Sequence, residues 1–151
     1  MKLKNNYYLL RHGEARSNKE RFVSCWPEKI YNPLTSKGIK QIKELIPILK
    51  KEKIDLIFSS DLLRCKQTTE IVAKKLNLEI IFNKRLREID VGNFNGKSVK
   101  DWGEFFTKYK KFKEHSHGGE NWTDVRKRML DFINNIDKRY ENRNIIIVGH
   151  G

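Results

Sequence analysis

Residue types that bind and transfer phosphate follow the apolar segments of this chain. Arg11 and His12 come directly after the apolar run 7–10, and Arg64, Glu88 and His150 follow three later apolar runs. Arginine binds phosphate through bidentate, charge-assisted hydrogen bonds. A histidine can act as a nucleophile, and a carboxyl group can protonate a leaving oxygen. Together these residue types indicate phosphoryl transfer without a metal ion, whereas Arg11 and His12 alone are equally typical of a cationic strand end without chemistry.

The elements that would position these residues are strands alternating with helices. We expect strands at 7–10, 54–60, 78–82 and 144–149. A short helix is expected at 15–22, and a longer helix at 121–140. Thr35 and Asp61 are expected to cap two further helices, and Ser98 forms a capping-box-like pair with Asp101 at the start of another. This alternation predicts an α/β fold, a three-layer αβα sandwich with a mostly parallel sheet. Ligands bind where the strands of such sheets end, so the phosphate-type residues should meet at one edge.

Two of the longer helices carry apolar residues at helical spacing. The first stripe consists of Ile39, Ile42, Leu45, Ile46 and Leu49, and the second of Trp122, Val125, Met129, Phe132, Ile136 and Tyr140. Both stripes predict packing against the sheet. Pro47 is expected to bend or shorten its helix near the end.

Length, charge and cysteine content limit the class of protein. The 151 residues make one domain, and the net charge of +13 is spread along lysine-rich helices. This spread favours solvated helix faces over a nucleic-acid-binding patch. Cys25 and Cys65 are too few for a disulfide framework, which indicates a reducing compartment. Without a signal-peptide pattern or an apolar run of membrane-spanning length, we expect a cytoplasmic protein that does not contact membranes.

An ordered set of motifs resembles the histidine phosphatase superfamily, whose founding fold is that of the cofactor-dependent phosphoglycerate mutases. The matching segments are RHGE at 11–14, PLTSKGIKQ at 33–41, SSDLLRCKQT at 59–68, LREIDVGNFNGKS at 86–98, GGEN at 118–121 and VGHG at 148–151. RHG alone is a weak signal, but the full set in this order is specific.

The resemblance implies a role for each matching residue. His12 would be the nucleophile that becomes phosphohistidine. Glu88 would donate a proton to the leaving group and then take one from water. The residues that would hold the phosphoryl group are Arg11, Arg64 and His150, with weaker contacts from Asn18 and Ser24. Glu14 would be structural or electrostatic. The resemblance further implies a small phosphorylated substrate, no cofactor and no metal ion.

The sequence departs from the family pattern at two cysteines. Cys25 stands where the family has glycine, in a segment that shapes the substrate pocket, so the substrate is not implied. Cys65 replaces a small residue next to Arg64, and we interpret it as a packing residue, with a redox-sensitive thiol as the alternative.

Other functions compete with a phosphatase. A phosphoglycerate mutase has the same fold, but the compact interval between Glu88 and His150 resembles the phosphatase branch. A basic nucleic-acid-binding domain that keeps an inactive phosphatase fold is a rival of another class. The segment 92–98 resembles a P-loop but lacks one residue between its glycines. His115 and His117, with Glu114 and Glu120, suggest zinc only weakly, because they lie in one loop.

The family continues past its second histidine into a further helix, whereas this sequence stops at Gly151. We therefore interpret residues 1–151 as one histidine phosphatase domain that is truncated at its C-terminus. Part of the strand at 144–149 would then lack cover, which would expose apolar surface. The sequence gives no indication of the oligomeric state.

Overall fold

A parallel sheet forms the middle of the molecule. The computed structural model describes residues 2–108, 112–115 and 117–151. Its strands are β1 (Asn6–Arg11), β2 (Leu56–Ser59), β3 (Ile80–Phe82) and β4 (Asn144–Gly149). They lie in the order β1-β4-β2-β3, and every neighbouring pair is parallel. The predicted parallel sheet is thus confirmed, although β2 and β3 are shorter than expected.

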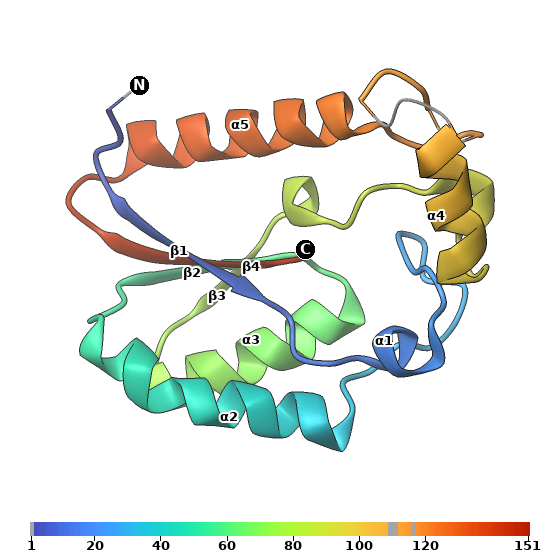
Figure 1. The fold of residues 1–151 in the computed structure, drawn as a ribbon. Coiled ribbons are helices and arrows are strands. Elements are labelled where there is room, and N and C mark those ends of the chain that lie inside the picture. The colour runs from blue at the N-terminus through green and yellow to red at the C-terminus, as the bar shows by residue number, and fades with distance from the viewer. Residues whose placement is uncertain (1, 109–111, 116) are drawn as a thin grey trace.

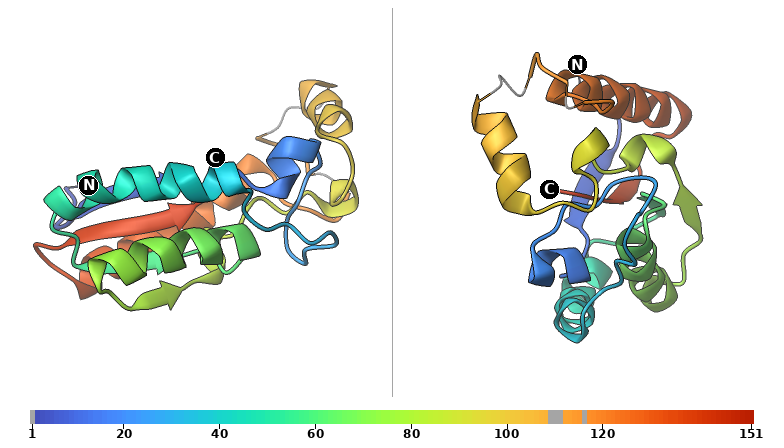
Figure 2. Two further views of the ribbon diagram at one scale, coloured as in Figure 1. Left: turned by 90° about the horizontal axis from the view of Figure 1, so that it is seen from below. Right: turned by 90° about the vertical axis from the view of Figure 1, so that its right-hand side faces the viewer.

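Helices cover both faces of this sheet, as Figure 1 shows. The helices α2 (Ser36–Lys51) and α3 (Leu63–Leu76) lie on one face, and α5 (Trp122–Arg139) lies on the other. The short α1 (Arg16–Glu20) and α4 (Val99–Lys108) lie beyond the end of the sheet at which β1 and β4 finish (Figure 2). Two 3-10 turns, η1 (Lys84–Leu86) and η2 (Gly92–Phe94), interrupt the loop between β3 and α4. The αβα sandwich is confirmed.

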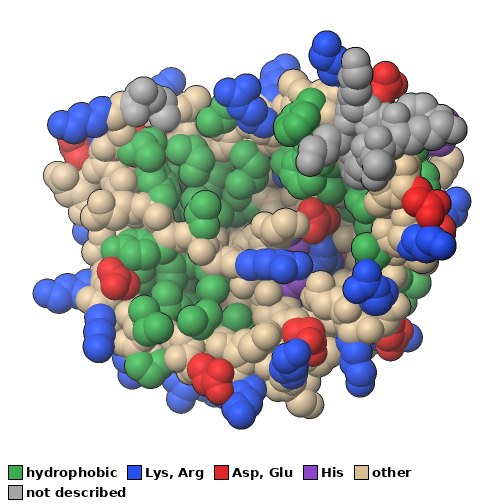
Figure 3. All heavy atoms as spheres, viewed as in Figure 1, with side chains coloured by type: hydrophobic (Ala, Val, Ile, Leu, Met, Phe, Trp, Pro, Cys, Tyr) green, Lys and Arg blue, Asp and Glu red, His purple; other side chains and the backbone are tan. Residues whose placement is uncertain are grey.

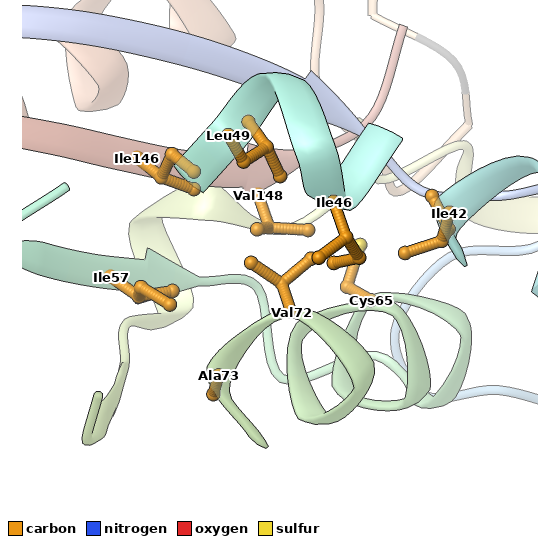
Figure 4. Packing of buried hydrophobic residues seen from close by; sticks show 9 residues of the cluster. All are labelled: Ile42, Ile46, Leu49, Ile57, Cys65, Val72, Ala73, Ile146 and Val148. Carbon is orange, nitrogen blue, oxygen red and sulfur yellow. The ribbon is translucent and has the colours of Figure 1, made fainter. Parts of the chain in front are cut away.

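The first hydrophobic core lies between the sheet and the helices α2 and α3 (Figure 4). Ile42, Ile46 and Leu49 of the predicted stripe are buried there, whereas Ile39 is 37% exposed, so the stripe prediction is wrong for that residue. Pro47 does not end α2, which continues to Lys51. Burial of Ile42, Ile46 and Leu49 in the core stabilises the helix on both sides of the proline.

The apolar stripe of α5 divides between two further cores. Phe132 and Ile136 pack against the opposite face of the sheet, with Met129 and Tyr140 at the margin of that core. Trp122 and Val125 lie one to two turns earlier and pack instead in a third cluster, whose buried members are Cys25, Ile89 and Val91. The stripe of α5 is a packing face, but only its later part packs against the sheet, whereas the start of α5 packs against the loops beyond the sheet.

Most predicted caps are confirmed, but Asp61 is not one. The hydroxyl of Thr35 accepts a hydrogen bond from Gly38 N, and Asn121 and Ser98 also accept bonds from the first turns of their helices. Helix α3 begins at Leu63, and its N-cap residue makes no side-chain bond. Asp61 is unavailable because both of its carboxylate oxygens accept hydrogen bonds from Arg87, at 2.6 and 2.5 Å.

The strand β4 lies between β1 and β2 and is well covered. Ile145, Ile147 and Val148 are at most 2% exposed, so the expected exposure of this strand is wrong. The exposed apolar side chain of this region is Leu9 on β1, at 78%. Within the described ranges, we find no helix with the length and apolar composition that crossing a membrane would require.

Candidate active site

The strand ends bring the phosphate-type residues together. His12 follows β1, Arg64 lies in the first turn of α3 after β2, Glu88 lies in the loop after β3, and His150 follows β4. Arg11, His12, Arg64 and Glu88 line a cavity of about 150 Å³, and His150 contacts Arg64 at its edge. Figure 3 shows a hollow on this face in which histidine atoms lie beside cationic and acidic side chains.

The buried imidazole of His12 has a defined tautomer. Its Nδ1 lies 2.8 Å from the carbonyl oxygen of Gly13, which can only accept, so Nδ1 carries the proton. Nε2 accepts a hydrogen bond of 3.1 Å from Nε of Arg64. Burial, and next the positive charge of Arg64, lower the pKa of His12 to about 4. Near neutral pH the ring is therefore uncharged and has a lone pair at Nε2.

The guanidinium of Arg64 is the hub of the site and is 2% exposed. Besides His12, it donates to Ser24 O at 3.1 Å and to Nδ1 of His150 at 3.0 Å, and it pairs with Oε1 of Glu28 at 3.3 Å. The other oxygen of Glu28 accepts from Leu63 N at 3.0 Å, so this carboxylate fixes both the guanidinium and the start of α3. Sequence reasoning missed Glu28, which lies in an irregular segment without periodic signal.

His150 is held from both of its nitrogens. Its Nδ1 faces Arg64, a group that can only donate, so Nδ1 accepts and the proton resides on Nε2. Nε2 donates to Oγ of Ser60 at 2.9 Å. Burial, followed by the charge of Arg64, lowers the pKa of His150 well below its usual value. Ser60 was also missed as a site residue, although it lies within the recognised SSDLLRCKQT motif.

The carboxyl group of Glu88 faces the same cluster. Oε1 accepts a hydrogen bond of 3.0 Å from Ile89 N, while Oε2 lies 3.7 Å from Nη2 of Arg64 and 3.6 Å from Nδ1 of His150. Burial raises the pKa of Glu88, and Arg64 opposes that shift without reversing it. The protonated carboxyl is thus accessible at a higher pH than in water, as a proton donor requires.

The remaining predicted site residues differ in their placement. Arg11 is exposed and Asn18 lines the cavity, where its amide oxygen accepts from Ala15 N at 2.9 Å. Ser24 lines the cavity as well, with its hydroxyl 3.5 Å from Nη1 of Arg64. Glu14 points to α2 instead, where it accepts from Thr35 at 2.8 Å and pairs with Lys37 at 3.0 Å.

Two motif glycines hold the first strand end against α2. A Cβ on Gly13 would lie 2.6 Å from Gly38 O, and a Cβ on Gly38 would lie 2.1 Å from Glu14 O. Both are shorter than any van der Waals contact. The glycines of RHGE and PLTSKG are therefore present because two backbones meet there, which places His12 next to α3 through the bond of Gly13 N to the Thr68 hydroxyl at 3.1 Å.

Both cysteines are buried and free. Burial raises the pKa of Cys65 to about 12 and that of Cys25 to about 11, so both thiols stay protonated near neutral pH. Cys65 belongs to the first core and is 0% exposed. A reactive thiol needs a lowered pKa and access, so this environment supports packing over redox sensing.

The competing motifs lack the geometry that they need. His115 pairs with Asp124 at 2.8 Å, and among the described residues no group of three or more histidine, cysteine, aspartate or glutamate side chains is placed to hold a metal ion. The P-loop-like segment 92–98 begins in the turn η2 and follows a loop rather than a buried strand. A P-loop requires that strand.

Comparison with known families decides the assignment. A family model described as "Histidine phosphatase superfamily (branch 1)" matches residues 7–151. The chain belongs to the histidine phosphatase superfamily. Together with the phosphatase among its relatives, this membership identifies the chain as an enzyme.

Curated relatives of this histidine phosphatase carry two kinds of name. Phosphoserine phosphatase 1 of Hydrogenobacter thermophilus is 32% identical over 148 residues, which cover 94% of this chain and 69% of the relative. An Escherichia coli protein named "Probable phosphoglycerate mutase GpmB" is 38% identical over 92 residues. That match covers 61% of this chain and 41% of the relative, so it spans less than half of the longer protein.

Solved structures share the fold of this histidine phosphatase. Bacillus stearothermophilus YhfR superposes with a TM-score of 0.86 at 31% identity, over 97% of this chain and 74% of that one. A phosphoglycerate mutase from Bacillus anthracis superposes with a TM-score of 0.79 at 23% identity, over 98% of this chain and 77% of that one. At that identity the second likeness concerns the fold alone, and it confirms the expected phosphoglycerate mutase-like architecture.

Proposed function

We propose that this histidine phosphatase hydrolyses small phosphomonoesters through a phosphohistidine on His12, with Glu88 as general acid and then general base. The observation that carries the proposal is the neutral imidazole of His12. Its lone pair at Nε2 lies beside Arg64, in a cavity that Glu88 also lines. A nucleophile, a proton donor and fixed positive charge thus occupy one small site.

In the first step, Nε2 of His12 attacks phosphorus and the bond from phosphorus to the leaving oxygen breaks. Glu88 transfers its proton to that oxygen, so the leaving group departs as a neutral alcohol. Arg64 stabilises the negative charge on the phosphoryl oxygens, assisted by Arg11 and by Nδ1–H of His150 in the tautomer in which Ser60 donates to Nε2. The phosphoryl oxygens take over the hydrogen bond that Arg64 makes to His12, which frees the lone pair.

In the second step, water attacks the phosphohistidine and the nitrogen–phosphorus bond breaks. The carboxylate of Glu88 takes a proton from the water, which restores its acid form, and His12 recovers its lone pair. Inorganic phosphate is the product. A mutase would use the hydroxyl of a second substrate in place of water, so the acceptor distinguishes the two activities.

The test is to trap the intermediate by rapid quench with a ³²P-labelled phosphomonoester. We expect protein-bound label that is labile in acid and stable in alkali, and that is absent in His12→Ala. His115→Ala is the matched control, because His115 is an exposed histidine that pairs with Asp124 outside the cavity. Label that persists in His12→Ala would overturn the proposal. Label transfer to phosphoglycerate faster than to water would instead establish a mutase.

The proposed mechanism requires no metal ion, because Arg11 and Arg64 supply the positive charge. Phosphatase activity should therefore survive exhaustive treatment with EDTA. The metal-site hypothesis would be revived if EDTA abolished activity, if zinc or magnesium restored it, and if His115→Ala prevented that restoration.

A further inference from the structure

The catalytic cavity has two chemically different ends. One end carries His12, Arg64 and Glu88, which handle the phosphoryl group. The other end is apolar and largely aromatic, and it is formed by Phe22, Val23, Val99, Trp102 and Trp122. With the phosphoryl group at the first end, the apolar end is the part of this cavity that remains for the alcohol part of the ester.

The apolar end is built from packed elements. The Trp102 ring stacks on Phe105 with centroids 6.0 Å apart and planes inclined by 9°, and it also contacts Phe94 at 5.5 Å. Trp122 packs in the third hydrophobic cluster. The start of α4 is fixed to the segment before it, because Val99 N donates to Arg21 O at 3.0 Å. The aromatic wall is therefore formed before any substrate binds.

Cations are confined to the phosphoryl end. Among the described residues that line the cavity, the only Lys or Arg side chains are Arg11 and Arg64, and the remaining charged group is Glu88. Arg87 and Arg128 line a neighbouring cavity that shares Glu88 with this one, and their charges are paired with Asp61 at 2.5 Å and with Glu120 at 2.8 Å. A carboxylate on the leaving group would thus meet aromatic rings and an acidic side chain.

We propose that the substrates are phosphomonoesters of uncharged alcohols with an aromatic or branched aliphatic body, and that the site discriminates against phosphorylated carboxylic acids. The inference rests on the proposed phosphatase function and adds the class of leaving group. It separates this chain from the substrates named for its relatives, since phosphoserine and phosphoglycerate both carry a carboxylate next to the phosphorylated group. An unpaired carboxylate against apolar walls loses hydration without compensation.

A matched pair of esters tests the proposal. Benzyl phosphate and 4-(phosphonooxymethyl)benzoate differ by one carboxylate that lies far from the reacting bond. We expect kcat/KM to be about 10- to 100-fold higher for benzyl phosphate, the range that an unpaired polar group produces. The kcat/KM values for phosphoserine and 3-phosphoglycerate should be as low as that for the carboxylated ester.

A positive charge introduced at the apolar end should weaken the preference for the uncharged ester. Val99 is 38% exposed on the first turn of α4, so Val99→Lys can place an ammonium group at the cavity without burying it. We expect this variant to narrow the ratio between the two esters by about tenfold, through improved turnover of the carboxylated one. Val99→Met, which adds length without charge, should keep the ratio of the unaltered enzyme.

The outcomes separate this inference from the phosphatase proposal. Turnover of both esters at equal kcat/KM, or preference for the carboxylated one, would overturn the inference alone. A ratio that Val99→Lys leaves unchanged would overturn it as well. If neither ester nor 4-nitrophenyl phosphate is hydrolysed or labels His12, the phosphatase proposal fails and the inference fails with it.

Discussion

His12 and Glu88 have pKa values that move in opposite directions. Burial lowers that of His12 to about 4 and raises that of Glu88 above its usual range. The proposed first step needs neutral His12 and protonated Glu88. The fraction of molecules with neutral His12 and protonated Glu88 is largest at pH values between the pKa of His12 and the pKa of Glu88.

The pH dependence of kcat/KM should therefore be bell-shaped, with its acid limb set by His12 and its alkaline limb set by Glu88. Activity falls below about pH 4 as His12 gains a proton, and it falls at higher pH as Glu88 loses one. Steady-state rates with an unactivated alkyl phosphate measure both limbs. With 4-nitrophenyl phosphate, whose leaving group needs no proton, Glu88→Gln should retain the first step. A high-pH limb that persists in Glu88→Gln would contradict the assignment.

Ser60 should matter through His150. A hydroxyl can accept from a ring nitrogen or donate to it, so Ser60 can hold Nε2 whichever nitrogen carries the proton. Ser60→Ala should lower kcat/KM by about tenfold, the effect of one lost hydrogen bond, and should change the ¹⁵N shifts of His150.

The adjacent Ser59 is the control for that experiment. It is equally buried, but its hydroxyl donates to Ser60 O and accepts from Thr69, away from His150. Ser59→Ala should leave the ¹⁵N chemical shifts of His150 unchanged. Equal losses of activity in the two variants, with unchanged shifts in both, would reduce Ser60 to a packing residue.

At the scale of elements, the contact between the end of β1 and the start of α2 should be intolerant of a methyl group. Gly38→Ala places Cβ 2.1 Å from Glu14 O and should destabilise the fold by about 1–3 kcal/mol. Gly103→Ala in α4 meets no heavy atom within 4 Å and should stabilise it by roughly 0.5–1 kcal/mol. Urea unfolding of both variants measures the difference. A stable Gly38→Ala protein with normal activity would show that the two backbones can separate.

Periodicity predicted the elements well because their packing is local and repetitive. Ile42, Ile46 and Leu49 recur at helical spacing and are buried together, and Thr35 caps the helix that they form. The predicted cap at Asp61 is wrong because Arg87, which is distant in sequence, donates two hydrogen bonds to this carboxylate, whereas a helix N-terminus would donate one.

The candidate site was predictable only as far as motifs extend. His12, Arg64, Glu88 and His150 lie in recognisable segments, and the fold brings them together. Glu28 was not predictable, because its contact with Arg64 depends on the path of an irregular loop that no local pattern encodes.

For the whole molecule, the order of the strands links the two ends of the chain. The paired strands β1 and β4 are the first and last strands of the sheet in sequence. A buried bond of 3.0 Å from Asn5 to Asp137 reinforces this closure. His12 and His150 consequently face each other, at 5.3 Å between ring centroids, only when the chain has folded from end to end.

The net charge of +13 should act on the rate of encounter. Positive side chains are scattered over the face that Figure 3 shows, which favours a diffuse attraction for phosphate dianions over one binding patch. We expect kcat/KM to fall severalfold between about 0.01 M and about 0.5 M salt, while kcat stays constant. Stopped-flow binding of an anionic ester checks the rate of association. A kcat/KM independent of salt would show that encounter is not limiting.

The hydrogen bond from Arg64 to Nε2 of His12 keeps the nucleophile capped at rest. An incoming molecule frees this lone pair only if it brings an anionic oxygen that accepts the hydrogen bond from the guanidinium more strongly than Nε2 does. Neutral electrophiles such as carboxylic esters or aldehydes bring no such exchange and meet a histidine whose lone pair is already engaged. In the proposed mechanism, selection for phosphate esters therefore precedes any bond-making, and the arginine that would stabilise the reaction would also decide which molecules can start it.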